Sequence, residues 1–252
     1  MRRYSQVFLK NKNIAKKIVE AFSNINPSQK ICEIGPGKVI LTEILYSYFG
    51  KDITVIDIDQ LMIEQIKLRF PEINAMHYDF LKINLDELDI SYFIGNLPYH
   101  ISTAIIEKLI KYKNFKGGVF MLQKEVAKKL VSTPKTPGYG YLSAAVNISC
   151  QTEYLFEVGK ENFFPVPKVD SAVVSIKKTK TIPPYDFEKY IKFIGYAFRH
   201  KRKTLLNSLI LSTDLGKECL IKILEKNSIS INTRAEELSP SKLFELSKMV
   251  EI

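Results

Sequence analysis

Apolar residues in the first 150 positions fall into two alternating spacings, which predict strands that alternate with helices. Ile14, Ile18, Val19 and Phe22 recur at helical intervals and predict an amphipathic helix. Short runs rich in apolar and β-branched residues predict strands at 30–34, 53–59, 73–78, 91–96 and 118–123. Helical patterns follow most of them, at 40–49, 61–70, 102–112 and 124–131. This rhythm is typical of βαβ units, so we expect an α/β fold with a mostly parallel sheet and helices on both faces.

The pattern changes after about residue 150. EYLFEV (153–158) and DSAVVSI (170–176) alternate as strands do and are close enough in sequence to pair. The Pro183-Pro184 step interrupts the chain, and only helical patterns follow it. We therefore predict two domains, an α/β domain at 1–180 and a small all-helical domain at 185–252.

Composition narrows the class of protein. Apolar residues make up 46% of the 252 residues and charged residues 25%, as in ordinary globular proteins, and no apolar run is long enough for a membrane span. The first residues are basic but lack the apolar core of a secretory signal, so we expect a cytoplasmic protein. The three Cys and three His are scattered, which predicts neither a disulfide framework nor a metal site.

Charge favours a polyanionic partner. The chain has 37 Lys and Arg against 27 Asp and Glu, a formal net charge of +10. Nucleic acid is a better candidate than a membrane surface because no basic amphipathic anchor is present. The densest basic run is 199–203, between two helical patterns, and Arg2 and Arg3 form a second basic group.

The first predicted strand runs directly into Glu33-Ile34-Gly35-Pro36-Gly37 and then into a helix. At the carboxyl edge of a parallel sheet, such a loop lets a nucleotide-like ligand approach the backbone. Ile40 occupies the third glycine position of the dinucleotide fingerprint, and no Walker lysine motif follows, so NAD, FAD and nucleoside triphosphates are poorly supported.

S-adenosylmethionine remains as the candidate ligand, because it has no pyrophosphate to cradle. Its ribose needs a carboxylate at the end of the next strand, and Asp57 ends ITVID about 20 residues further on. Its adenine amine needs an acceptor near the following strand end, where Asp79 stands with Phe80 beside it to pack on the ring.

GNLPYHIST (95–103) follows the fourth strand. With it the chain resembles the small-subunit (16S) rRNA adenine dimethyltransferase family, the KsgA type, with the macrolide-resistance methyltransferases as close relatives. The blocks that carry the resemblance are SQVFL (5–9), EIGPG (33–37), VIDID (55–59), YDFL (78–81), GNLPYHIST, MLQKEVAKKL (121–130), PGYGYLSAAV (137–146), FFPVPKVDSAVV (163–174) and FRHKRKTLLNSL (198–209).

The resemblance implies a Rossmann-like methyltransferase domain at 1–180 and a helical domain at 185–252 that contributes to rRNA binding. It implies dimethylation, with S-adenosylmethionine, of adjacent adenosines near the 3′ end of the small-subunit rRNA within the immature 30S subunit. Carried over position by position, the family's cofactor contacts fall on Val7, Leu9, Gly35, Asp57, Asp79 and Asn96.

Three positions depart from the family's usual pattern. Val7 replaces an Asn or His, so only a backbone contact could survive there. Asp57 replaces a common Glu and reaches one methylene less far, and Val39 stands where the broader methyltransferase motif has a third glycine. None of these changes removes a group that methyl transfer requires.

The expected chemistry depends on orientation more than on a strong base. We expect the Asn96 side-chain oxygen and the Leu97 or Pro98 carbonyl to accept the two N–H bonds of the target amine, so that its lone pair points at the methyl group. Tyr99 is expected to stack on the flipped adenine. The resemblance places Phe163 on the opposite face of that ring.

The expected RNA contacts are the phosphate-binding candidates Arg199, Lys201, Arg202, Lys203 and Lys168. We expect a monomer, because no helix pattern carries a long exposed apolar stripe. Two alternatives stay open: a large-subunit rRNA methyltransferase of the resistance type, and a non-catalytic RNA-binding assembly or transcription factor that kept the fold. NLPY and the VDSAVV extension count against the first, and the intact 96–99 sequence counts against the second.

Overall fold

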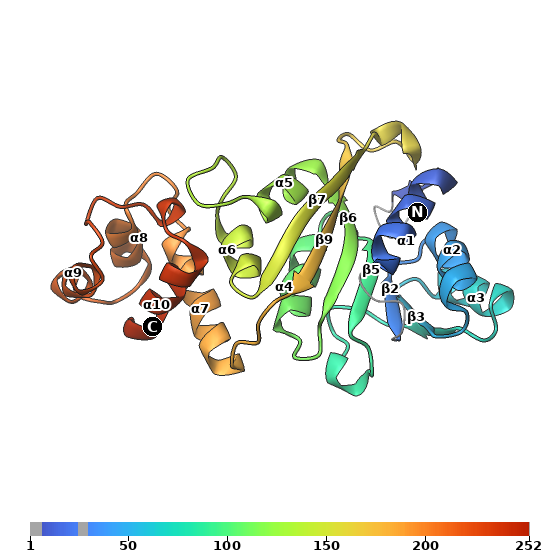
Figure 1. Ribbon diagram of the computed structural model, residues 1–252, viewed down its shortest axis with the longest axis horizontal. Helices are drawn as coiled ribbons and strands as arrows, with labels where there is room; N and C mark the ends of the chain where they lie inside the picture. Colours follow the sequence, from blue (N-terminus) through green and yellow to red (C-terminus); the bar gives the residue numbers. More distant parts are fainter. Residues whose placement is uncertain (1–6, 25–29, 252) are drawn as a thin grey trace. The chain divides into compact units, whose positions relative to one another are not determined.

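The computed structural model describes residues 7–24 and 30–251, and its centre is a seven-stranded sheet with the strand order β4-β3-β2-β5-β6-β9-β7 (Figure 1). The strands are β2 (Ile31–Ile34), β3 (Ile53–Asp57), β4 (Asn74–His77), β5 (Tyr92–Asn96), β6 (Gly117–Gln123), β7 (Cys150–Val158) and β9 (Ser171–Lys178). The strands from β4 to β6 in this order pair in parallel, and β9 pairs antiparallel with β6. The predicted mostly parallel α/β sheet is confirmed.

Helices cover both faces of this sheet. The helices that accompany it are α1 (Lys12–Ser23), α2 (Ile40–Phe49), α3 (Gln60–Arg69), α4 (Ser102–Lys111) and α5 (Lys124–Val131). Buried residues of α1, α2 and α3 pack with Ile31, Val55 and Ile94 in one core (Figure 1). On the other face Phe93 of β5 lies among the rings of Phe80, Tyr112 and Phe115. Alternate residues of each strand therefore supply two apolar layers.

A short two-stranded ribbon lies beside the main sheet. It pairs β1 (Phe8–Leu9) antiparallel with β8 (Phe163–Phe164). The backbone N–H of Lys10 donates to the Asn162 carbonyl at 2.9 Å, and Asn11 Nδ2 donates to Asn162 Oδ1 at 2.8 Å. Asn11 also caps α1, since its side chain accepts the N–H groups of residues 13 and 14. The ribbon thus holds the segment before α1 against residues 162–164.

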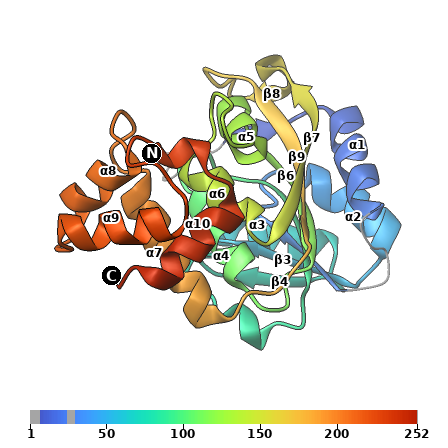
Figure 2. The ribbon, with the colours of Figure 1, turned by 60° about the vertical axis from the view of Figure 1, so that its left-hand side comes forward.

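The contacts divide the chain into two compact units, one of residues 1–127 and 151–179 and the other of residues 128–150 and 180–252. The second unit contains α6 (Tyr141–Asn147), α7 (Pro184–Ala197), α8 (Leu205–Ser212), α9 (Lys217–Lys226) and α10 (Pro240–Met249), which gather together in Figure 2. Tyr190 of α7 donates its buried hydroxyl to the Ala144 carbonyl of α6 at 2.9 Å. This contact groups 128–150 with the C-terminal helices, whereas the sequence pattern placed that stretch in the first domain.

Most predicted elements form within one or two residues of their expected bounds. The strand expected at 53–59 ends at Asp57, and the pairing of EYLFEV with DSAVVSI is confirmed because β7 and β9 are neighbours. Helix α6 and the two-residue strands β1 and β8 were not predicted. Across the described ranges, every helix is too short or too polar to traverse a bilayer.

Candidate active site

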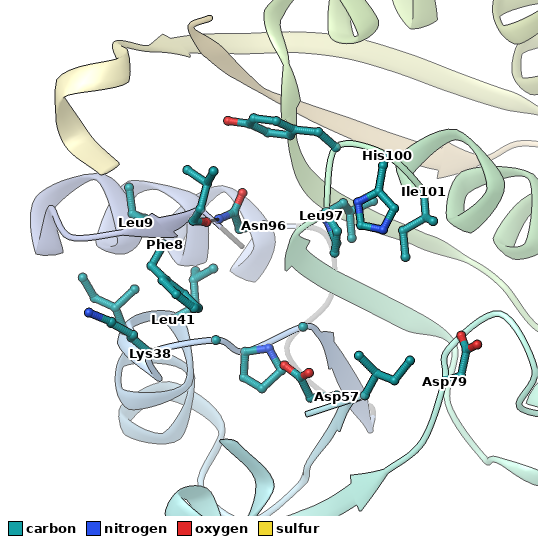
Figure 3. Close-up of a pocket in the computed structure, with 18 of the residues that line it drawn as sticks. Phe8, Leu9, Lys38, Leu41, Asp57, Asp79, Asn96, Leu97, His100 and Ile101 are labelled. Atoms are coloured by element: carbon teal, nitrogen blue, oxygen red, sulfur yellow. Dashed lines mark hydrogen bonds between the residues drawn. The ribbon is translucent and has the colours of Figure 1, made fainter. Parts of the chain in front are cut away.

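A cavity of about 240 Å³ opens at the carboxyl ends of β2, β3 and β5 (Figure 3). Figure 3 shows Asn96 and Leu97 on one side of it and Asp57 on the other, with Phe8 and Lys38 at one end and Asp79 at the other. The residues that line it are Val7, Phe8, Leu9, Gly35, Pro36, Gly37, Lys38, Ile40, Leu41, Asp57, Ile58, Asp79, Leu81, Asn96, Leu97, Pro98, Tyr99, His100 and Ile101. All six residues expected to hold the cofactor are among them.

The loop after β2 brings backbone to the cavity wall. Gly35 and Gly37 have φ of +67° and +52°, which side chains disfavour, and a Cβ on Gly37 would lie 2.8 Å from the Phe8 ring. Val39 has φ of +68°, a conformation that costs a branched residue roughly 1–2 kcal/mol. A glycine would adopt this conformation without that cost.

Asp57 ends β3 with its side chain buried, 6% exposed. Its Oδ1 accepts the backbone N–H of Asp59 at 2.8 Å. Burial raises the pKa of Asp57, while hydrogen bonds from the backbone of residues 37, 58 and 59 lower it in part. The carboxyl group is thus held rigidly against the cavity, where it can accept hydrogen bonds from a diol.

The segment that carries Asp79 is held from α4. Asp79 Oδ1 accepts the Leu81 N–H at 3.0 Å. Lys108 Nζ donates to the carbonyls of Leu81 at 2.8 Å and Ile83 at 2.5 Å, and burial lowers the pKa of Lys108. The role expected for Phe80 is not supported, because Phe80 is buried edge-on against Phe93 and does not line the cavity. Ile58 and Leu81 line it instead.

The end of β5 makes a close backbone approach to β2. A Cβ on Gly95 would lie 2.5 Å from the Ile34 carbonyl oxygen, so this position accommodates only glycine. The next residue, Asn96, donates through Nδ2 to the Val7 carbonyl at 3.2 Å. This bond orients the amide and leaves Oδ1 available as an acceptor. The backbone of Val7 thus holds Asn96, while its side chain packs against the apolar core.

The two carbonyls after Asn96 differ in their partners. The Pro98 carbonyl accepts the Ile101 N–H at 3.1 Å, whereas the Leu97 carbonyl has no hydrogen-bond donor among the residues that the structure describes. The Leu97 N–H donates to the Met121 carbonyl at 3.1 Å and fixes the loop to β6. Of the two expected backbone acceptors, Leu97 is the more available.

The two aromatic candidates lie in different surroundings. Tyr99 lines the cavity, and its hydroxyl is 2.7 Å from Ser171 Oγ at the start of β9. Burial raises the pKa of the Tyr99 hydroxyl. Phe163 is fully buried and does not line the cavity, because its side chain points to the core side of β8. Its neighbour Phe164 is 52% exposed.

The basic candidates are on the surfaces of both units. Arg199, Lys201, Arg202 and Lys203 are all exposed in the connection between α7 and α8 of the second unit. Lys168 is exposed in the first unit, between β8 and β9. Within the described part of the chain none of these five takes part in an ion pair. Arg2 and Arg3 lie outside the described residues.

Beneath the loop after β2 lies a buried acid. Glu33 is 0% exposed, its Oε2 accepts the Thr42 hydroxyl at 2.6 Å, and its Oε1 has no partner among the described residues. The pKa of Glu33 is raised to about 8, mainly by burial and in smaller part by the nearby Asp57, while the Thr42 hydrogen bond lowers it. Glu33 thus braces the start of α2 mainly in its neutral form near pH 7.

Sequence reasoning missed three residues that shape this site: Lys38, Lys108 and Ser171. Lys108 occupies a helix position where a lysine is usually solvated, and Ser171 begins a strand without any local signal. The sequence places Lys38 in the glycine loop but does not indicate which residues it contacts. Their contacts are to residues 25 to 126 positions away, which no local pattern reveals.

Comparison with known proteins finds similarity to one family along nearly the whole chain. Residues 1–251 match the family model described as "Ribosomal RNA adenine dimethylase". A protein of Malacoplasma penetrans (strain HF-2) named "Ribosomal RNA small subunit methyltransferase A" is 37% identical over 240 residues, 94% of this chain and 87% of the relative. A protein of the same name from Chlorobium luteolum is 34% identical over 254 residues, 99% of this chain and 89% of the relative. The crystal structure of a dimethyladenosine transferase from Plasmodium falciparum superposes with a TM-score of 0.79 at 27% identity, covering 95% of each chain.

Proposed function

Because the chain belongs to the ribosomal RNA adenine dimethylase family, we propose that it transfers two methyl groups to the N6 amine of each of two adjacent adenosines near the 3′ end of small-subunit rRNA. The observation that carries this proposal is the single cavity that joins Asp57 and Asp79 to the 96–99 loop. The methyl donor is S-adenosylmethionine, and the substrate is the immature 30S subunit. The protein acts in the cytoplasm as a monomer.

The residues of the cavity suit S-adenosylmethionine. The Asp57 carboxylate can accept both ribose hydroxyls, and Asp79 can accept the adenine amine between the apolar walls of Ile58 and Leu81. Backbone at Gly35, Val7 and Leu9 is close enough to hold the methionine end. When bound, the cofactor supplies a sulfonium methyl group, which is a good electrophile.

Asn96 and Leu97 perform the orienting work. Asn96 Oδ1 and the Leu97 carbonyl accept the two amine hydrogens, which makes the nitrogen pyramidal and directs its lone pair. With the cofactor bound, this orientation would aim the lone pair at the sulfonium methyl group, and the amine proton would be released to solvent. Well-aligned reactants gain about 7–11 kcal/mol from such positioning. No residue has to act as a strong base, so His100 at the cavity wall needs no titrating role.

The second transfer requires room beside the amine. After the first methyl group is added, only one hydrogen remains, and one acceptor must yield its place. An amide that can rotate about its side-chain bonds meets this demand better than a buried carboxylate, whose desolvation would be costly. Among the described residues the Asn96 side chain has one hydrogen bond, to the Val7 carbonyl, so rotation of the amide breaks one hydrogen bond.

Tyr99 and the basic residues bind the RNA. The Tyr99 ring stacks on the flipped adenine, and its hydroxyl bond to Ser171 holds the ring edge. Arg199, Lys201, Arg202, Lys203 and Lys168 contact phosphates, which makes affinity fall steeply with salt. The buried Phe163 can stack on the other ring face only if substrate binding exposes it, so this role stays a prediction.

The test is methyl transfer from labelled S-adenosylmethionine. We expect label in dimethyladenosine of immature small subunits and none in naked large-subunit rRNA. Label only in the large-subunit RNA would favour the resistance-type enzyme, and no label in either would favour a non-catalytic RNA-binding factor.

Asn96→Ala tests the orienting role. We expect turnover to be lost while affinity for small subunits stays within about threefold, because the amide orients the amine and contributes little to RNA affinity. Asn13→Ala, at an exposed position of α1, is the matched control and should retain full turnover. Normal turnover in Asn96→Ala with collapsed RNA binding would show that the assigned role is wrong.

A further inference from the structure

A lysine and two aromatic rings form a small patch at the end of the cavity opposite Asp79, which we call the Lys38 patch (Lys38, Phe8 and Phe164). Lys38 Nζ lies 5.4 Å from the centre of the Phe8 ring and 5.3 Å from that of Phe164. Figure 3 shows Lys38 beside Phe8 at the cavity edge. The patch therefore joins the glycine loop to both strands of the β1–β8 ribbon.

The charge in this patch is not neutralised by the protein. Lys38 is exposed, and within the described part of the chain no carboxylate lies within 4 Å of its ammonium group. Lys168, in the segment after β8, is also exposed without an ion pair in those residues. The positive charge of Lys38 at the cavity wall favours an anionic occupant, and Lys168 adds a second positive charge to the segment after β8.

The apolar part of the patch faces solvent. Adjacent residues of a strand point to opposite sides, so the burial of Phe163 in β8 directs Phe164 outward, where it is 52% exposed. Val166 and Val169 in the same segment are 60% and 43% exposed. An aromatic surface next to lysines is typical of proteins that bind single-stranded nucleic acid.

We propose that the Lys38 patch binds the nucleotide next to the target adenosine, with its base on the Phe164 ring and its phosphate at Lys38. This inference rests on the proposed function. Extrusion of the target base removes a stacking partner from its neighbour in the strand. An exposed ring at the mouth of the cavity replaces that partner, and the ammonium group neutralises the phosphate between the two nucleotides.

The competing role is a purely structural clasp, in which Lys38 holds the ribbon to the glycine loop. Such a clasp would act on the cavity itself, so its loss would weaken cofactor binding and RNA binding together. A nucleotide subsite predicts a separation instead: RNA affinity changes, while cofactor affinity does not.

The experiment measures the affinity for immature small subunits by filter retention at several salt concentrations, and for S-adenosylmethionine by calorimetry. Phe164→Leu keeps an apolar side chain without a ring, and we expect it to lower RNA affinity at least about fivefold. Lys38→Met keeps the apolar stem, and we expect it to reduce the slope of log affinity against log salt by about 0.7, whereas Lys38→Arg keeps the slope. Affinity for S-adenosylmethionine should change less than twofold in all three.

Matched controls come from the same unit. Tyr48→Leu removes a ring that is 47% exposed near the end of α2, and Lys51→Met removes an exposed lysine just before β3, at the opposite edge of the sheet. Both should bind RNA as the wild type does. Wild-type RNA affinity and salt slope in the Phe164 and Lys38 variants would overturn the subsite, as would an equal loss of cofactor affinity. Failure of the wild type to methylate small subunits would instead overturn the proposed function, and the binding measurements would still decide the subsite.

Discussion

Replacing Glu33 by glutamine should change how stability depends on pH. Burial raises the pKa of Glu33 from 4.5 to about 8, so the folded protein retains a proton that the unfolded chain releases. Below pH 4.5 both states are protonated and the side chain contributes no pH dependence. Above it, the wild type loses stability with rising pH until the folded state also ionises near pH 8. Glutamine does not titrate, so Glu33→Gln removes this loss.

The magnitude follows from the size of the shift. One pKa unit corresponds to 1.36 kcal/mol, so the free energy of unfolding of Glu33→Gln should rise relative to the wild type by about 1.4 kcal/mol per pH unit. Across the interval from 4.5 to about 8 the change is roughly 4–5 kcal/mol. The new amide group also replaces Oε1, which has no partner among the described residues. Any effect of this on the free energy of unfolding is the same at every pH, so it shifts the curve of that free energy against pH without changing its slope.

Urea unfolding followed by circular dichroism at pH 5, 6, 7 and 8 measures this difference. Glu64→Gln, at an exposed position of α3, is the control and should run parallel to the wild type. Thr42→Val removes the hydrogen bond that lowers the pKa of Glu33. The free energy of unfolding of this variant should therefore keep falling to a higher pH than that of the wild type. A Glu33→Gln curve parallel to the wild type would refute the reasoning.

Two further substitutions test how the cavity is held. Lys108→Met removes the ammonium bonds to the carbonyls of Leu81 and Ile83, and we expect the Kd for S-adenosylmethionine, measured by calorimetry, to rise about fivefold or more while turnover at saturation is retained. The exposed Lys111→Met is its control, and an unchanged Kd in Lys108→Met would contradict the positioning role. Tyr99→Phe keeps the ring and loses the Ser171 bond, so kcat/KM for small subunits should fall only a few-fold, whereas Tyr99→Leu should lose at least about tenfold more through lost stacking. Equal effects of the two Tyr99 changes would argue against stacking.

The regular part of the fold was predictable because its periodicity is local. Ile14, Ile18, Val19 and Phe22 occupy one buried face of α1, as their spacing indicated. The inner parallel strands β2, β3, β5 and β6 are buried almost throughout because both of their faces are covered, whereas β4 at the sheet's edge is partly exposed. The place of β9 between β6 and β7 depends on pairing across about 50 residues, and that is not encoded in any local pattern.

The candidate site was likewise predictable where local patterns place its residues, and not where long-range pairing does. Gly35, Asp57, Asp79 and Asn96 each lie at or just after the carboxyl end of a strand, so the rule that parallel strands end at one edge was sufficient to bring them together. The burial of Phe163 and the exposure of Phe164 depend on the pairing of β8 with β1. A strand of two residues is too short to be predicted from the sequence. Phe80 was misassigned because a side chain next to a cavity residue can point into the opposite apolar layer.

With the roles proposed above, the hydrogen bond from Asn96 to the Val7 carbonyl predicts a thermodynamic linkage between cofactor and adenosine binding. Val7 and Leu9 line the cavity, and the same segment holds the Asn96 amide through the Val7 carbonyl. A ligand that restricts this segment would lower the entropy cost of binding the other. Because such coupling is reciprocal, each substrate should raise the affinity for its partner by the same factor.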